Sequence, residues 1–217
     1  MDWLKDVHDT RKLSSLKNIP HSKHSASMRP YLCLMYLFWN KFQYQNTTII
    51  QQLNNGIRSF EVLLTIYDNR IHIKSDAIYN TICWYSFEKI LEEIYSFLNE
   101  HNKEFIFLDI SCDETFTKKH FKSLWKYFDE KYYPPKLYIF DEQICNIRGS
   151  LIPVISNDTI MYKPIHMGYI NKNNNIHMNN LEYDNLNLLN NKLNFVKIPF
   201  VNNKIVEKLY KVNIYDD

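Results

Sequence analysis

Residues 51–66 read QQLNNGIRSFEVLLTI and contain the end of a helix, a corner and the start of a strand. The turn NNG at 54–56 is typical of a helix C-cap, because asparagine and glycine tolerate the left-handed backbone that ends a helix. The run SFEVLLTI at 59–66 is short and rich in β-branched and apolar residues, which predicts a buried strand. A helix over 47–55 is therefore predicted to lead directly into a strand.

Similar patterns on either side extend this arrangement. Further strands are predicted at Arg70–Lys74, Glu104–Ile110 and Ser150–Ile155, with a shorter one at Lys136–Phe140. A helix over 86–99 has Ser86 as its N-cap and an inward stripe of Phe87, Ile90, Leu91, Ile94, Phe97 and Leu98. A second helix, over 117–131, is expected to bury Phe121, Leu124, Trp125 and Phe128. Strands that alternate with helices predict parallel pairing and an α/β fold.

The composition restricts the classes of function. The chain has 217 residues, 45% of them hydrophobic, which is enough for one sizeable core. It has 3 glycines where an average chain of this length would have about 15, so glycine-rich phosphate loops are excluded. A net charge of +2 makes nucleic acid an unexpected partner. The bias toward Asn, Ile, Lys and Tyr is typical of an AT-rich genome, a viral one included.

The chain is expected to be one domain over residues 1–217, with an asparagine-rich loop or insert at 170–192. Its start has no apolar signal segment, and its most apolar stretch, Tyr31–Trp39, is too short to cross a bilayer. We therefore expect an intracellular protein, in the host cytoplasm or a virion if the source is viral. Its four cysteines are expected to be reduced, buried thiols.

Five segments, taken in order, resemble the X-domain of phosphatidylinositol-specific phospholipase C in its bacterial, single-domain form. The segments are Leu13–Pro20 (LSSLKNIP), Gln51–Val62 (QQLNNGIRSFEV), Ser86–His101, Glu104–Ile110 (EFIFLDI) and Asn146–Ile152 (NIRGSLI). The resemblance covers about residues 3–155. It implies a TIM-like (β/α) barrel, irregular or truncated in its second half, with its site at the carboxyl ends of the strands.

The resemblance also implies which residues would carry catalysis. Cleavage in this family uses two histidines as general base and acid, a carboxylate beside the first histidine, and an arginine or calcium ion over the phosphate. The first histidine falls on Lys23. A register slipped by one residue places it on His24 instead, and both registers stay open.

The remaining catalytic positions depart from the family pattern. The carboxylate of the G-I-R-x-F-E motif is present as Glu61, but Leu63 stands where the arginine or calcium-binding acid belongs. The second histidine falls on Lys74 and Ser75. His72 shares a strand face with Lys74, and we expect it to lie one layer deeper in the barrel.

The losses of base, acid and phosphate clamp predict a catalytically inactive phospholipase C-like protein that acts as a binding or interaction module. Four residues are candidates for binding an anionic headgroup at the barrel mouth: His21, Lys23, Arg58 and Lys74. An ion pair between Arg58 and Glu61 is an equally open interpretation. The expected partners are a phosphoinositide headgroup at a membrane surface, or a protein.

Two alternatives stay open. The first is an active phosphodiesterase with a rewired site of His24, Glu61 and His72, and the second is a structural component of a particle. Asp109 ends a predicted strand, where barrel sites collect catalytic groups. No cofactor or metal is expected, because the pair His21-x-x-His24 has no third ligand at metal spacing.

Overall fold

The computed structural model of the chain describes these residues: 6–11, 16, 19–22, 25–27, 45–75, 82–117, 119–120, 122–124, 144–155, 175–177, 195–198 and 206–207. The predicted strand at Lys136–Phe140, the apolar stretch Tyr31–Trp39 and the site candidates Lys23 and His24 lie outside these residues.

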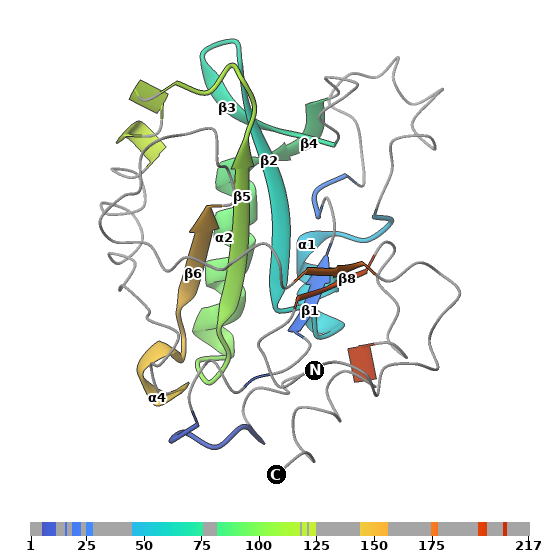
Figure 1. Cartoon of the computed structure of the whole chain (residues 1–217), viewed down its shortest axis with the longest axis vertical. Helices are drawn as coiled ribbons and strands as arrows, with labels where there is room; N and C mark the ends of the chain where they lie inside the picture. Colours follow the sequence, from blue (N-terminus) through green and yellow to red (C-terminus); the bar gives the residue numbers. More distant parts are fainter. Residues whose placement is uncertain are drawn as a thin grey trace.

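β2 (Ser59–Tyr67) is the strand around which the sheet is built. On one edge, its first two residues pair in parallel with β1 (Ile19–Ser22), and its residues 63–67 pair antiparallel with β3 (Arg70–Lys74). The other edge pairs in parallel with β5 (Ile106–Cys112). Figure 1 shows β2 between β5 on one side and β1 on the other. Each predicted strand in this group therefore exists, with its ends shifted by up to two residues.

The remaining strands extend the sheet in both directions. β6 (Leu151–Ile155) lies beside β5, β8 (Phe195–Ile198) beside β1, and β7 (Asn175–His177) beside β8, all in parallel. This confirms a mixed α/β fold with parallel strands. Within the described residues no pairing joins β6 to β7, so the sheet is not a closed barrel there. β7 lies inside the predicted asparagine-rich insert.

One part of the sheet differs from the purely parallel expectation. β2, β3 and β4 (Ile82–Ser86) form consecutive antiparallel pairs. Asp68 and Asn69 connect β2 to β3 with φ angles of 48° and 56°. Two residues are enough for a tight hairpin, whereas a parallel crossover needs a dozen or more. The shortness of this connection therefore determines the direction of β3.

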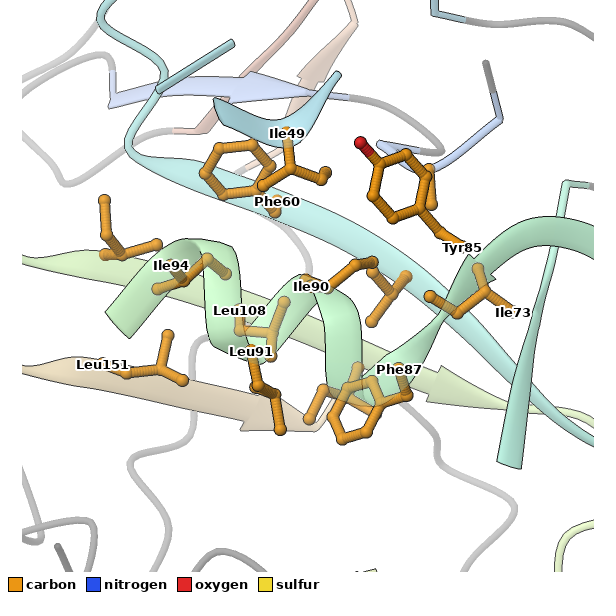
Figure 2. Close-up of a cluster of buried hydrophobic side chains, with 14 of the residues drawn as sticks. Ile49, Phe60, Ile73, Tyr85, Phe87, Ile90, Leu91, Ile94, Leu108 and Leu151 are labelled. Atoms are coloured by element: carbon orange, nitrogen blue, oxygen red, sulfur yellow. The ribbon is translucent and has the colours of Figure 1, made fainter. Parts of the chain in front are cut away.

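α2 (Phe87–Glu100) covers one face of the sheet, as Figure 2 shows. Ser86 is its N-cap, and its hydroxyl accepts a hydrogen bond from the backbone N–H of Lys89 at 3.2 Å. All six residues of the predicted stripe are buried. They pack on Phe60, Val62 and Leu64 of β2, which belong to the same core cluster.

α1 (Ile49–Asn54) precedes β2 and has a capping box. The Thr48 side chain accepts from the backbone of Gln51, and the Gln51 side chain accepts from the backbone of Thr48. Asn55 is the C-cap, and Gly56 follows with a φ of 94°, which glycine adopts without strain. The predicted end of this helix is confirmed.

Other expectations are met only in part. The predicted helix over 117–131 is helical at 119–120 and 122–124, where Leu124 is buried, and its remaining apolar positions lie outside the described residues. Cys83 and Cys112 are buried free thiols, but Cys145 is exposed at α4 (Ile144–Ile147), so the expectation of burial was wrong there. No helix in the described part of the chain is long and apolar enough to cross a membrane.

A buried ion pair links the start of β2 to the segment before β5. Nε of Arg58 donates to the Glu104 carboxylate at 2.6 Å, and both side chains are almost fully buried, at 0% and 1% exposed. The Arg58 Nη1 donates to the carbonyls of Leu53 and Ile57, each at 2.8 Å. The guanidinium also lies over the Phe97 ring, 4.9 Å from its centroid. Arg58 thus connects the end of α1, the start of β2 and α2.

Removing one partner of this pair should destabilise the fold more than removing both. Arg58→Met leaves the Glu104 carboxylate buried without its cation, which should cost about 3–5 kcal/mol of unfolding free energy by chemical denaturation. The double variant Arg58→Met/Glu104→Leu removes both charges and should recover much of that loss. A double variant less stable than Arg58→Met would contradict this interpretation.

Candidate functional site

The carboxyl ends of β1, β2, β5 and β6 lie along one edge of the sheet, which we call the mouth (Figure 1). Side chains alternate along β2, so Phe60, Val62 and Leu64 face α2 while the odd-numbered residues face the opposite side, the inner face. Polar side chains therefore reach the inner face at Glu61 and Thr65. Asp109 of β5 stands directly opposite Glu61 in the register.

Leu63, Lys74 and Asp113 meet at the mouth. Lys74 of β3 is opposite Leu63 of β2 in the ladder. Its ammonium forms an ion pair with the carboxylate of Asp113, the residue that follows β5, and the two side chains are only 6% and 9% exposed. We call Leu63, Lys74 and Asp113 the mouth cluster. Lys74, the one cation of the mouth cluster, is thus neutralised by Asp113.

Threonines hold the Asp113 carboxylate in place. Its Oδ1 accepts from the backbone N–H of Thr115 at 3.0 Å and from the hydroxyl of Thr115 at 2.5 Å. The Thr115 hydroxyl is in turn 3.2 Å from that of Thr65 and accepts from the backbone N–H of Ile66 at 3.0 Å. Burial alone would raise the pKa of Asp113, but hydrogen bonds from Lys74, Thr115 and Thr65 outweigh it and lower the pKa below its usual value. The carboxylate is therefore charged at neutral pH, and the ion pair is formed.

Ser75 follows Lys74 and carries a hydroxyl where catalysis in the family would need the imidazole of the second histidine. Its side chain is fully buried, and its hydroxyl has no hydrogen-bond partner among the described residues. Leu63 is 8% exposed and can neither pair with a phosphate nor bind calcium. Leu63 thus occupies the position that the resemblance assigns to the phosphate clamp, and Lys74 and Ser75 occupy the position of the second histidine.

The chain on either side of Lys23 and His24 is held against residues 60 and 61 of β2. Ser22 pairs with Phe60, and the backbone N–H of Ser25 donates to the Glu61 carbonyl at 3.0 Å. The Ser25 hydroxyl donates to the Ser22 carbonyl at 2.8 Å. The two residues between them, which the two registers of the motif assign to the first histidine, are not among the described ones.

His21 lies away from the mouth cluster. It is 1% exposed, stands opposite Ser59 at the start of β2, and its Nδ1 is 2.6 Å from the Ser59 hydroxyl. Leu63 is four residues further along the same strand, a separation of about 13 Å. His21 is therefore a buried histidine near the carboxyl end of β1, set apart from the mouth cluster along β2.

Arg58 is also placed differently from the expectation. It precedes β2, at the opposite end of the strand from the mouth, and its guanidinium is engaged by Glu104. The partner is thus Glu104 and not Glu61. The Arg58 guanidinium is thus fully buried and paired at this end of the strand, away from the mouth.

His72 lies further out than the mouth cluster, whereas a deeper position was expected. β3 runs antiparallel to β2, so the residue two before Lys74 pairs two residues further along β2, at Thr65. The backbone positions of His72 and Glu61 are therefore separated by about 13 Å along the strand. Desolvation, then the nearby Arg70, lowers the pKa of His72, while Asp68 acts in the opposite direction. The imidazole is neutral at pH 7, which does not suit a general acid.

Asp113 is the functional candidate that the sequence reasoning missed. The strand was expected to end at Ile110, which made Asp109 its terminal acid, but β5 continues to Cys112. Polar residues at 109, 111 and 113 recur every second position, and this alternation was the available signal. Among the described residues no group of three or more His, Cys, Asp or Glu side chains is placed to hold a metal.

Comparison with solved structures identifies the fold. The chain is similar to phosphatidylinositol-specific phospholipase C from Listeria monocytogenes, with a TM-score of 0.72 and 17% identity over 98% of both chains. It is also similar to the phosphatidylinositol-specific phospholipase C of Staphylococcus aureus, with a TM-score of 0.53 and 18% identity over 71% of this chain and 52% of that one. The match thus spans about half of the S. aureus enzyme. No family model and no curated protein matches the sequence. The phospholipase C-like fold expected from the resemblance is confirmed.

The mouth ion pair should make stability depend on pH in a defined window. Asp113→Asn should cost about 3 kcal/mol of unfolding free energy near pH 7, because Lys74 then lacks its counter-charge. Because the folded-state pKa of Asp113 is lowered, this contribution is present above pH 3.8 and is lost as the pH falls through the folded value. Denaturant titrations from pH 7 to 3 measure the difference between the two proteins.

Glu114→Gln is the matched control, since Glu114 is the exposed acid next in sequence. It should change stability by a few tenths of a kcal/mol at most. Equal losses in Asp113→Asn and Glu114→Gln would contradict a specific role for the mouth cluster.

Proposed function

We propose that this chain is a catalytically inactive phospholipase C-like protein that acts by binding. The observation that carries the proposal is the mouth cluster: an apolar side chain, Leu63, and an internally neutralised cation, Lys74, where phosphodiester cleavage requires a clamp over the phosphate. A fold alone does not determine chemistry, which depends on the residues at the site.

Three chemical requirements support this proposal. The inositol hydroxyl must lose a proton, the leaving oxygen must gain one, and the charge on the pentavalent phosphorus must be stabilised. Ser75 cannot donate a proton at neutral pH as an imidazolium does. Lys74 is held by Asp113 and offers no free charge to a phosphate. Leu63 offers none either.

The alternative of a rewired site gains no support from the geometry. It needs His24, Glu61 and His72 around one phosphate. The register separates Glu61 from His72 by four positions along β2, and the lowered pKa of His72 leaves its ring neutral. Binding is therefore the proposed function, and the turnover assay with phosphatidylinositol vesicles described below tests the rewired site.

The proposed partner is an anionic phosphoinositide headgroup at a membrane surface. The basic candidate that stays for this role is Lys23, since Arg58 and Lys74 are each paired with an acid. Glu61 and Asp109 stand opposite each other on the inner face in the β2–β5 register. A protein partner is the second proposal, and it would not depend on lipid.

The catalytic part of the proposal is tested with phosphatidylinositol vesicles. Purified protein should release no inositol phosphate above the buffer control, and His24→Ala and His72→Ala should behave like the unmodified chain. The Listeria enzyme serves as positive control for the assay. Measurable turnover that is lost in His24→Ala would contradict the proposal and support the rewired site.

The binding part is tested by co-sedimentation with vesicles with and without phosphatidylinositol. Binding should depend on the anionic lipid, and Lys23→Gln should weaken it about fivefold, since one lysine near a charged surface contributes about 1 kcal/mol. Lys103→Gln is the control, because Lys103 is exposed at the opposite end of β5. Equal binding of all three proteins to neutral vesicles would contradict headgroup recognition and favour a protein partner.

A further inference from the structure

A buried glutamine of α1 connects this helix to the end of β1 and to the segment that follows β1. Gln52 is fully buried and lies in the buried stripe of α1 with Ile49 and Leu53, which both belong to the hydrophobic core. An apolar side chain would suit this stripe, whereas a buried amide loses hydration free energy unless it is hydrogen-bonded. A polar side chain at this position therefore depends on the partners that it finds inside the protein.

The Gln52 amide has a partner for each of its polar atoms. Its Oε1 accepts from the hydroxyl of Ser22, the last residue of β1, at 2.5 Å. Its Nε2 donates to the carbonyl of Ser25 and to that of Thr47, each at 2.9 Å. Because carbonyls only accept, the amide has a single orientation that satisfies all three partners. Gln52 thus joins the end of β1, the turn at 25–27 and the segment before α1.

Two of these partners, Ser22 and Ser25, flank Lys23 and His24. Their side chains are 0% and 1% exposed. The Ser25 hydroxyl donates to the Ser22 carbonyl at 2.8 Å, and the Ser25 backbone N–H donates to the Glu61 carbonyl at 3.0 Å. The two flanks are therefore tied to each other, to β2 and, through the glutamine, to α1.

We propose that Gln52 is a positioning residue for the mouth: it fixes the chain on either side of Lys23 and so presents this lysine to an anionic headgroup. The inference rests on the proposed function and adds the residue that makes a single lysine effective. A lysine on an unrestrained loop loses backbone freedom when a ligand orders it, which opposes binding. Flanks that are fixed in advance remove that part of the cost. Gln52 is 0% exposed, so it acts through the chain it holds and contacts no ligand itself.

The first test is co-sedimentation with phosphatidylinositol vesicles. Gln52→Met keeps a side chain of similar length in the core and removes the amide, so the carbonyls of Ser25 and Thr47 lose this donor. Binding should weaken about fivefold, as in Lys23→Gln, because the lysine is present but no longer held in place. Ser22→Ala removes only the bond to Oε1 and should weaken binding about twofold, so the test does not depend on one variant folding.

A double-variant cycle separates positioning from a general loss of stability. Lys23→Gln should weaken binding less than about twofold in the Gln52→Met background, because the two changes remove the same contribution. Leu151→Ala provides the control background. It opens a cavity in the core at β6, which β5 and β2 separate from β1 in the sheet. There Lys23→Gln should keep its full effect of about fivefold.

Hydrogen exchange of the Ser25 amide tests the inference without lipid and so separates it from the proposed function. Exchange should be about tenfold faster in Gln52→Met and unchanged in Leu151→Ala, because only the first change loosens the flank locally. If the unmodified chain does not bind vesicles, the proposed function is contradicted and the Ser25 amide alone decides the inference. Equal exchange in Gln52→Met and the unmodified chain, or an undiminished effect of Lys23→Gln in Gln52→Met, would overturn the proposal.

Discussion

The two-residue alternation of β2 is the constraint on which the rest of the structure depends. Phe60, Val62 and Leu64 are buried against α2, so Glu61, Leu63 and Thr65 must face the other side. A slip of one residue would expose the apolar set and bury a carboxylate in the core. β1, β3 and β5 all take their register from this strand. The identity of a few odd-numbered residues therefore decides what the mouth can do.

The same constraint explains how a scaffold can persist while its chemistry changes. The core needs only the even-numbered face of β2 and the matching faces of β5 and α2, and these are intact. The mouth cluster is built on the opposite face, where Lys74 and Asp113 neutralise each other. A lysine with an internal counter-charge stabilises the hairpin against the end of β5. The same ion pair neutralises the charge of Lys74 at the mouth.

Local patterns predicted the local structure well. The Ser86 cap, the six buried positions of α2 and the corner at Gly56 depend on neighbours within one helical turn, and the sequence shows them directly. β4 was missed, because ICWYS is short and merges with the helix that follows. The direction of β3 was missed because the resemblance to a parallel barrel outweighed the two-residue turn at Asp68 and Asn69.

Pairings between distant residues were the least predictable part of the site. Arg58 pairs with Glu104, which is 46 residues away, and Lys74 pairs with Asp113 across β2. Such partners follow from the register of the sheet, which no single segment encodes. His72 shows the same limit. The face of β3 on which it lies was predicted, but its position along β2 depends on whether β3 runs parallel or antiparallel to β2.

The central claim is that the mouth is neutralised by the chain itself and holds no catalytic pair. A crystal structure of the protein grown with myo-inositol 1-phosphate tests it most directly. We expect an intact ion pair between Lys74 and Asp113, and imidazoles of His24 and His72 more than about 8 Å apart, too far to serve one phosphate. An open ion pair, with Lys74 on the phosphate and both imidazoles beside it, would contradict the account.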